Sequence, residues 1–297
     1  MIHFRFNRPV GQSRTYVYLC RMFEKMTLRG FVVICAMVLT SACSKYQKLL
    51  KSTDLDQKYE AAIKYYDAQD YYRALPLFEE LLTAYRGNLR AEEVYYHYAY
   101  CHYAMGEHLA AAHHFMNFTR TFPKSEHAEE AAYMYAYCFY LQSPISSLDQ
   151  EYSLKAMNEL QLFINRYPQS DRVSKCNELI DKIRAKLQQK AFDNAYLYYK
   201  IGDYQAAAIA FKNTLKDFPG TPYEEETLFL AVKASYLYAK NSTDRRKLVR
   251  YKEALEEYRN FASRYPDSKY MKEAKDFEEN ILNEISLREP SKAETKL

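Results

Sequence analysis

A group of histidines around one cysteine is the part of the sequence best suited to bind a metal ion. His97 and Cys101 are four residues apart, which would place two zinc ligands on one face of a helix. Five of the other six histidines lie close by, at His102, His108, His113, His114 and His127. However, a closely similar segment carries Cys138 without a matching histidine, and His102 and His108 stand where packing between helices calls for an aromatic ring. We therefore expect these side chains to pack inside the protein and expect no metal site.

Motifs of other catalytic chemistries are missing from the sequence. It has no glycine-rich phosphate loop, no nucleophile elbow and no HExxH zinc motif. Adjacent acids such as Glu79-Glu80 and Glu256-Glu257 are typical of a solvated helix face. We expect no catalytic residue and no bound cofactor, and therefore predict that the chain is not an enzyme.

Cys43 is the residue whose surroundings indicate covalent modification. Lys25 and Arg29 precede nine apolar residues, 31–39, too few to span a bilayer but typical of a secretory signal peptide. The following Ser-Ala-Cys resembles a bacterial lipobox, which implies cleavage before Cys43 and a lipid on its thiol. Thr40 departs from that pattern, because lipoboxes usually have leucine there. Ordinary secretion with a coincidental cysteine is the alternative.

The chain divides into four parts on this basis. We predict a signal peptide with a lipobox over 1–42, a lipidated tether over 43–55, a helical repeat array over 56–287 and a disordered tail over 288–297. Met22 and Met26 are alternative translation starts. The lipid would anchor the protein without a spanning helix. Because no acidic cluster follows Cys43, we expect the periplasm-facing leaflet of the outer membrane.

The charge of the chain argues against nucleic acid as a partner. Of 42 basic and 38 acidic side chains, residues 1–42 hold six and one, which leaves 36 basic and 37 acidic groups beyond them. A nucleic-acid-binding protein needs a basic face of its own. Past Cys43 the thiols are Cys101, Cys138 and Cys176. Three thiols cannot pair completely, so we expect buried small hydrophobic side chains rather than a disulfide framework.

Four aromatic-proline pairs mark regular boundaries along the chain. They are Phe122-Pro123, Tyr167-Pro168, Phe218-Pro219 and Tyr265-Pro266, each followed two residues later by Ser125, Ser170, Thr221 or Ser268. Proline ends a helix, and a serine or threonine hydroxyl accepts hydrogen bonds from the N–H groups that begin the next one. Thr221 is the clearest predicted N-cap, with Pro222 at the first helical position and Glu224 three residues on.

A small residue and a bulky residue, four positions apart, recur before these boundaries. The pairs are Ala111/Phe115, Ala156/Leu160, Ala207/Phe211 and Ala254/Tyr258, and a fifth copy without the proline is Ala74/Phe78. This order resembles the tetratricopeptide family of helix–turn–helix repeats. The chain is therefore predicted to be all-α, a solenoid of about five such units plus a C-terminal helix near 269–287. We also expect a long helix near 171–199 and a kink at Pro76.

Tyrosines line one face of the first helix of several units. In two nearly identical segments they recur at i, i+4 and i+7, which places each trio on one helix face. The full set is Tyr59, Tyr66, Tyr96, Tyr100, Tyr103, Tyr133, Tyr137, Tyr140, Tyr196 and Tyr199. In the tetratricopeptide family this face lines a groove that binds extended peptides. Packing between repeats is the alternative reading of these ten residues, which we call the tyrosine face.

The lipobox, the tether beginning Ser44-Lys-Tyr-Gln-Lys-Leu-Leu50 and five units together resemble one family. This is the BamD family, the lipoprotein subunits of the machinery that folds β-barrel proteins into the outer membrane. The resemblance implies a scaffold without catalysis. Its C-terminal repeats would hold the periplasmic domains of the BamA barrel, and its N-terminal groove would help to receive unfolded barrel precursors.

Two other functions fit parts of the pattern. A tetratricopeptide lipoprotein adaptor that recruits cell-wall hydrolases would have the same anchor, but the tether and the five-unit length fit it less well. Glycan-binding outer-membrane lipoproteins use similar repeats, but they are much longer and bind sugar on tryptophan platforms. This chain has no tryptophan.

Overall fold

The computed structural model describes residues 45–289, so the predicted signal peptide, Cys43 and tail residues 290–297 lie outside the described residues. Within this range the secondary structure is helical and there is no strand. The chain forms two compact units, one ending at Glu107 and the other beginning at His108. The predicted all-α fold of helix–turn–helix repeats is confirmed.

The first unit contains three long helices and a short helical segment before them. Residues 45–50 are helical, and they are followed by α3 (Leu55–Asp67), α4 (Tyr71–Ala84) and α5 (Ala91–Ala104). Helix α4 packs against both α3 and α5 and contributes Ala74, Leu77, Phe78 and Leu81 to the core. Pro76 lies inside α4 as predicted, at an exposed position.

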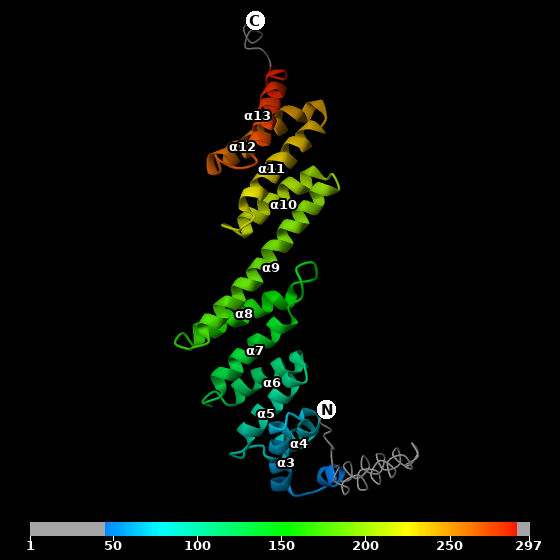
Figure 1. Cartoon of the computed structure of the whole chain (residues 1–297), viewed down its shortest axis with the longest axis vertical. Helices are drawn as coiled ribbons and strands as arrows, with labels where there is room; N and C mark the ends of the chain where they lie inside the picture. The colour runs from blue at the N-terminus through cyan, green and yellow to red at the C-terminus, as the bar shows by residue number, and fades with distance from the viewer. Residues whose placement is uncertain (1–44, 290–297) are drawn as a thin grey trace, which may run out of the picture. The chain divides into compact units, whose positions relative to one another are not determined.

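The second unit is also built of consecutive helices joined by short turns and loops (Figure 1). Its elements are α6 (His108–Thr121), α7 (Ala128–Gln142), α8 (Glu151–Arg166), α9 (Val173–Lys200), α10 (Tyr204–Asp217), α11 (Glu224–Lys240), α12 (Asp244–Arg264) and α13 (Met271–Ser286). Each helix packs mainly against the next one along the chain, as in a solenoid, and α13 also contacts α11. The long helix and the final helix predicted from the sequence are α9 and α13.

The small and bulky residues of the repeat form the interior of both units. All five alanines of the predicted pairs have no exposed surface, and their partners Phe78, Phe115, Leu160, Phe211 and Tyr258 are buried. An alanine lets two helices approach closely, and the large side chain one turn away fills the space beside it. The repeat pattern therefore predicted the core because helix packing requires that alternation of size.

The boundary residues after each proline differ in detail from the prediction. The hydroxyl of Ser170 accepts a hydrogen bond from the backbone N–H of Arg172 (3.1 Å), and that of Thr221 accepts one from Tyr223 (3.3 Å). Helix α11 begins only at Glu224, so the expectation that Thr221 is its N-cap and Pro222 its first residue is wrong. The hydroxyl bonds two residues ahead and closes a turn, which delays the start of the helix.

The described part of the predicted tether packs against the first unit. Tyr46 donates its hydroxyl to the carbonyl of Arg73 (3.0 Å) and meets the Tyr65 ring edge-on at 5.6 Å. Lys58 is only 1% exposed, and its ammonium donates to the carbonyl of Leu50 (3.0 Å) and to both carboxylate oxygens of Glu80 (2.5 and 2.6 Å). These bonds fasten residues 45–50 to α3 and α4.

The cysteines of the helical region are free thiols inside the protein. Cys101, Cys138 and Cys176 are buried and form no disulfide, which confirms the predicted burial. Burial raises the pKa of Cys101 and of Cys138 to about 12 and that of Cys176 to about 11. Across residues 45–289, no helix combines the length and the apolar character needed to cross a membrane.

Candidate functional site

The tyrosine face is partly exposed throughout. All ten predicted tyrosines are half-buried, neither enclosed in the core nor fully in solvent. Their surroundings nevertheless differ between the first unit and the second, because different side chains lie opposite them.

Three tyrosines of α7 form a continuous stack. The ring centroids of Tyr133 and Tyr137 are 5.6 Å apart with 12° between the ring planes, and those of Tyr137 and Tyr140 are 5.9 Å apart with 15° between the planes. Residues at i, i+4 and i+7 share one face of a helix, so the three rings lie along the helix as a ladder. We call these three residues the α7 ladder.

Two basic side chains flank the α7 ladder, one just before α9 and one in its first half. The guanidinium of Arg172 lies 5.6 Å from the centre of the Tyr133 ring. Lys182 donates to Glu178 (2.6 Å), which raises the pKa of Lys182, and Tyr140 and Tyr137 make smaller contributions in the same direction. The ladder is therefore an aromatic strip with cations along its edge.

A second ladder occupies the end of α9. The rings of Phe192 and Tyr196 stack at 6.0 Å and 11°, and those of Tyr196 and Tyr199 at 6.0 Å and 17°. The ammonium of Lys200 lies 4.7 Å from the centre of the Tyr196 ring, and that of Lys233 lies 6.0 Å from the Tyr199 ring. These aromatic residues are called the α9 ladder.

A hollow of about 340 Å³ opens beside the α9 ladder. Tyr196, Leu197, Lys190 and Lys200 line it from α9, and Ser146 and Ser147 line it from the loop before α8. The Lys190 ammonium donates to the carbonyls of Ser146 (3.3 Å) and Leu148 (2.8 Å), which holds the loop against α9. The hollow therefore has a fixed wall, an aromatic side and a positive charge.

Two tyrosines of the first unit serve instead as links between helices. Tyr59 donates its hydroxyl to the Glu93 carboxylate (2.5 Å), and burial together with this bond raises the pKa of Tyr59 to about 12. The ring of Tyr66 contacts Phe78 at 6.2 Å and His97 at 4.5 Å. For Tyr59 and Tyr66, packing between helices accounts for the contacts observed.

The tyrosines of α5 repeat the ladder pattern with steeper angles. Tyr96 and Tyr100 lie 4.8 Å apart with 60° between their planes, and Tyr100 and Tyr103 lie 6.1 Å apart with 82°. The identical spacing in α5 and α7 therefore places the rings together in both helices, but they are parallel only in α7.

The histidines near Cys101 occupy packing positions. His97 stacks on Phe78 at 5.7 Å, and His102 meets the Tyr98 ring edge-on at 4.8 Å. Glu107 lies 2.6 Å from Nδ1 of His102. Nowhere in the described part of the chain do three or more His, Cys, Asp or Glu side chains gather as they would around a metal ion.

A groove between α6 and α8 was not predicted from the sequence. Its volume is about 790 Å³, and Tyr135 of α7 forms part of its floor. Tyr135 is two residues from Tyr133, which turns it to the opposite side of α7 from the ladder. One sequence feature could have indicated this groove. A basic residue stands shortly before an aromatic-proline pair at Arg120 and again at Arg166.

Comparison with known proteins places the chain in a family. The crystal structure of the P58(IPK) TPR domain matches with 16% sequence identity and a TM-score of 0.36, and the match covers 94% of this chain and 83% of that one. No curated protein matches. The YfiO family, described as "Outer membrane lipoprotein", matches residues 51–248, which is more than half of the chain. The chain therefore belongs to the YfiO family of outer-membrane lipoproteins, which is the BamD-like family that its sequence resembles.

Proposed function

We propose that this protein is a non-catalytic scaffold of the outer-membrane β-barrel assembly machinery. In this proposal a lipid on Cys43 anchors it to the outer membrane, on the side that faces the periplasm. It binds the periplasmic domains of a BamA-type barrel and helps to receive unfolded barrel precursors. Its membership of a family of outer-membrane lipoproteins supports the anchor and the compartment.

The stacked ladders of α7 and α9 are the observation that best supports precursor binding. Tyrosine offers a large apolar surface and a hydroxyl while losing little conformational entropy on binding. Within the described residues, the hydroxyls of Tyr137 and Tyr140 have no hydrogen-bonding partner. They are therefore available to the backbone of an extended chain whose aromatic side chains pack on the rings.

The ladders are positioned before any ligand arrives. The α7 rings support one another by stacking, and Tyr133 also meets Phe163 of α8 at 5.8 Å. Lys186 donates to the hydroxyl of Ser143 (2.5 Å), which ties the end of α7 to the middle of α9. A preformed surface binds more tightly because fewer side chains must be ordered on binding.

The last helices carry the surface proposed for the BamA-type barrel. Val249 of α12 and Leu282 of α13 are both exposed, and they line a shallow hollow of about 510 Å³. Lys252 and Arg259 lie at its edge with Glu253 and Glu256. An apolar centre with a charged rim is the usual composition of a protein–protein interface.

The α7 ladder can be tested by replacing Tyr137 and Tyr140 together with alanine. Because buried aromatic contacts dominate interface energetics, the double variant should bind a urea-unfolded outer-membrane barrel protein about tenfold more weakly. Binding would be followed by fluorescence anisotropy of the labelled barrel protein after dilution from urea. The matched control is Tyr198→Ala, which removes an exposed tyrosine of α9 that belongs to neither ladder.

The control separates ladder binding from a general loss of aromatic surface. Far-UV circular dichroism should be the same for all three proteins, because neither Tyr137 nor Tyr140 is fully buried. If the double variant and Tyr198→Ala bind the barrel protein as tightly as the original chain does, the ladder is not the precursor site.

A further inference from the structure

The groove between α6 and α8 is lined by no residue of either ladder and has a different chemistry. Its α6 side consists of Met116, Thr119 and Arg120, and its α8 side includes Glu159, Leu162 and Arg166. Ala132 and Tyr135 of α7 form the floor between them. A volume of about 790 Å³ is in the range of sites that enclose a ligand or a few side chains.

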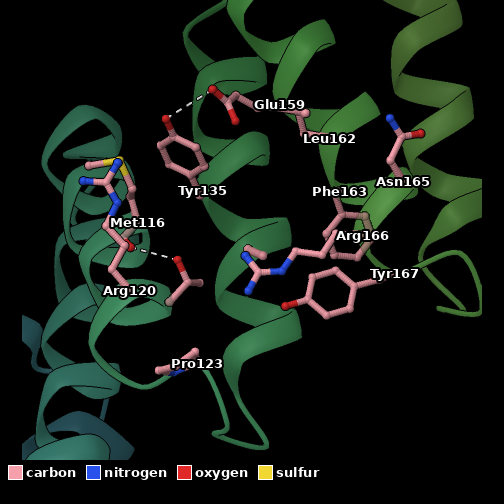
Figure 2. A pocket seen from close by; sticks show the side chains of 12 residues that line it. Met116, Arg120, Pro123, Tyr135, Glu159, Leu162, Phe163, Asn165, Arg166 and Tyr167 are labelled. Atoms are coloured by element: carbon pink, nitrogen blue, oxygen red, sulfur yellow. Dashed lines mark hydrogen bonds between the residues drawn. The ribbon is translucent and has the colours of Figure 1, made fainter.

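Two arginines enter this groove from opposite sides (Figure 2). Arg120 lies beside Met116 on α6, and Arg166 extends from α8 next to the ring of Tyr167. The guanidinium carbon of Arg166 is 5.5 Å from the centre of that ring. Throughout residues 45–289, neither arginine forms an ion pair with a carboxylate, although most other arginines in this range do.

The single acid in the groove is already engaged. The Tyr135 hydroxyl donates to Oε1 of Glu159 (3.3 Å), and Figure 2 shows this pair at the end of the groove away from Pro123. Burial, followed by the negative charge of Glu159, raises the pKa of Tyr135, so the phenol remains a donor to that carboxylate. Glu159 is thereby held by Tyr135, and the two guanidinium groups remain without an anion.

The groove also presents apolar surface that the fold does not cover. Leu162 is 59% exposed, although it lies on the α8 side of the groove, and Phe163 is buried beneath it. A planar guanidinium binds a carboxylate through two parallel hydrogen bonds, and it does so best next to apolar surface that excludes water. The arginines would bind acidic groups of a ligand, and the exposed leucine and the aromatic rings would contact apolar groups of the same ligand.

We propose that this groove binds an acidic segment of a partner protein, whose carboxylates pair with Arg120 and Arg166 and whose apolar side chains pack on Leu162. A peptide fits better than an isolated phosphate group for two reasons. The second oxygen of Glu159 can accept a backbone N–H of a peptide, whereas an ionised phosphate group offers it no such donor. A phosphate also has no apolar group that could pack against the exposed side chain of Leu162.

A pair of synthetic peptides tests this proposal on the full chain in detergent. The first is a fluorescein-labelled 12-residue peptide that alternates Asp and Glu with Leu and Phe, and the second has Asn and Gln in place of the acids. Hydrogen bonds to charged groups contribute more than neutral ones, so the acidic peptide should bind at least about tenfold more tightly than its amide counterpart. Fluorescence anisotropy gives both affinities.

Two variants assign that preference to the groove. The double substitution Arg120→Gln and Arg166→Gln should abolish the preference for the acidic peptide. The control Arg184→Gln removes an exposed arginine of α9 outside the groove and should leave the preference unchanged. Equal affinity for the two peptides, or a preference that survives in the double variant, would overturn the proposal.

A competition experiment distinguishes a protein ligand from a lipid headgroup. Dihexanoyl phosphatidylglycerol below its micelle concentration should not displace the acidic peptide. If this lipid displaces the peptide from the original chain but does not bind the double variant, the groove takes an anionic headgroup and the peptide proposal is wrong.

Discussion

Cys101 and Cys138 occupy matching places in α5 and α7, and neither has any exposed surface. Burial deprives the charged thiolate of its hydration, which raises the pKa of each thiol to about 12. Only the thiolate is an effective nucleophile. The local environment therefore makes both residues chemically inert, in agreement with a packing role.

This inertness predicts a measurable protection from alkylation. With a pKa of about 12, roughly one thiol in ten thousand is ionised at pH 8, compared with about one in four for an unperturbed cysteine. Iodoacetamide at pH 8 should therefore leave Cys101 and Cys138 unmodified in the folded protein and label both in 6 M guanidinium. Peptide mass spectrometry measures the labelling at each site. Labelling of either cysteine at the same rate in both conditions would contradict the predicted burial.

Some contacts of single residues could be predicted from the sequence and others could not. The spacing of Tyr59 and Tyr137 correctly placed each on a helix face, because helix geometry fixes the direction of a side chain. The spacing also placed Tyr133 and Tyr140 on the same face of α7 as Tyr137, where the three rings stack. It could not show that Glu93 of α5 lies opposite Tyr59 of α3, because that contact depends on how the helices are placed relative to one another.

At the scale of elements, a buried lysine fastens the segment that precedes α3. Lys58 has an ammonium with three acceptors, one on Leu50 and two on Glu80. A charge with so little exposure depends on such partners, because water cannot replace them. If a lipid is attached at Cys43, the anchor lies only two residues before this fastened segment.

Replacing Glu80 with glutamine should loosen this clasp. The buried ammonium would lose its carboxylate partner, so the free energy of unfolding should fall by roughly 1–3 kcal/mol. Amide hydrogen exchange over residues 45–58 should also become faster than in the original chain. Glu79→Gln is the matched control, since Glu79 is an exposed neighbour that does not contact Lys58. Equal exchange rates for both variants would show that the ion pair does not hold the segment.

The turn between α9 and α10 depends on a glycine. Gly202 has φ of +84°, and its N–H and that of Asp203 donate to the carbonyls of Tyr199 (3.2 Å) and Tyr198 (3.1 Å), which closes the end of α9. Asp203 then accepts from the N–H of Ala206 (3.0 Å) and begins α10. The corresponding turn of the first unit uses Gln69, with φ of +58°.

Gly202→Ala should therefore destabilise the protein by about 1 kcal/mol. A Cβ at this position would meet no atom within 4 Å, so the cost comes from the left-handed backbone alone. Gln69→Gly should instead stabilise the protein, because it relieves the same backbone strain in the first unit. Urea unfolding measures both changes. A stability gain from Gly202→Ala would show that the turn does not require this conformation.

The helices themselves were predictable because the repeated residue types are those that helix packing requires. Paired small and bulky residues gave the core, and aromatic-proline pairs gave the boundaries. The start of α11 was misplaced because the Thr221 hydroxyl bonds two residues ahead rather than within the helix. The groove between α6 and α8 was missed because Arg120 and Arg166 are 46 positions apart and line the same groove only after α6 and α8 pack beside α7.

At the scale of the whole molecule, the chain combines a predicted anchor with surfaces for other proteins. Family membership supports the outer membrane as its location, and the described residues offer tyrosine ladders, a groove with two arginines and an apolar hollow near the end. A series of stacked repeats can present several such surfaces along one chain. The proposed scaffold function therefore requires that more than one protein be bound at a time.

The central claim is best tested by isolating the protein with its partners. A C-terminally tagged full chain would be purified from detergent-solubilised envelopes, and the proteins that elute with it would be quantified by mass spectrometry. The scaffold proposal predicts a large outer-membrane barrel protein with repeated periplasmic domains, recovered in amounts close to those of the tagged chain. Recovery of cell-wall hydrolases without that barrel would contradict the proposal and favour an adaptor of cell-wall enzymes.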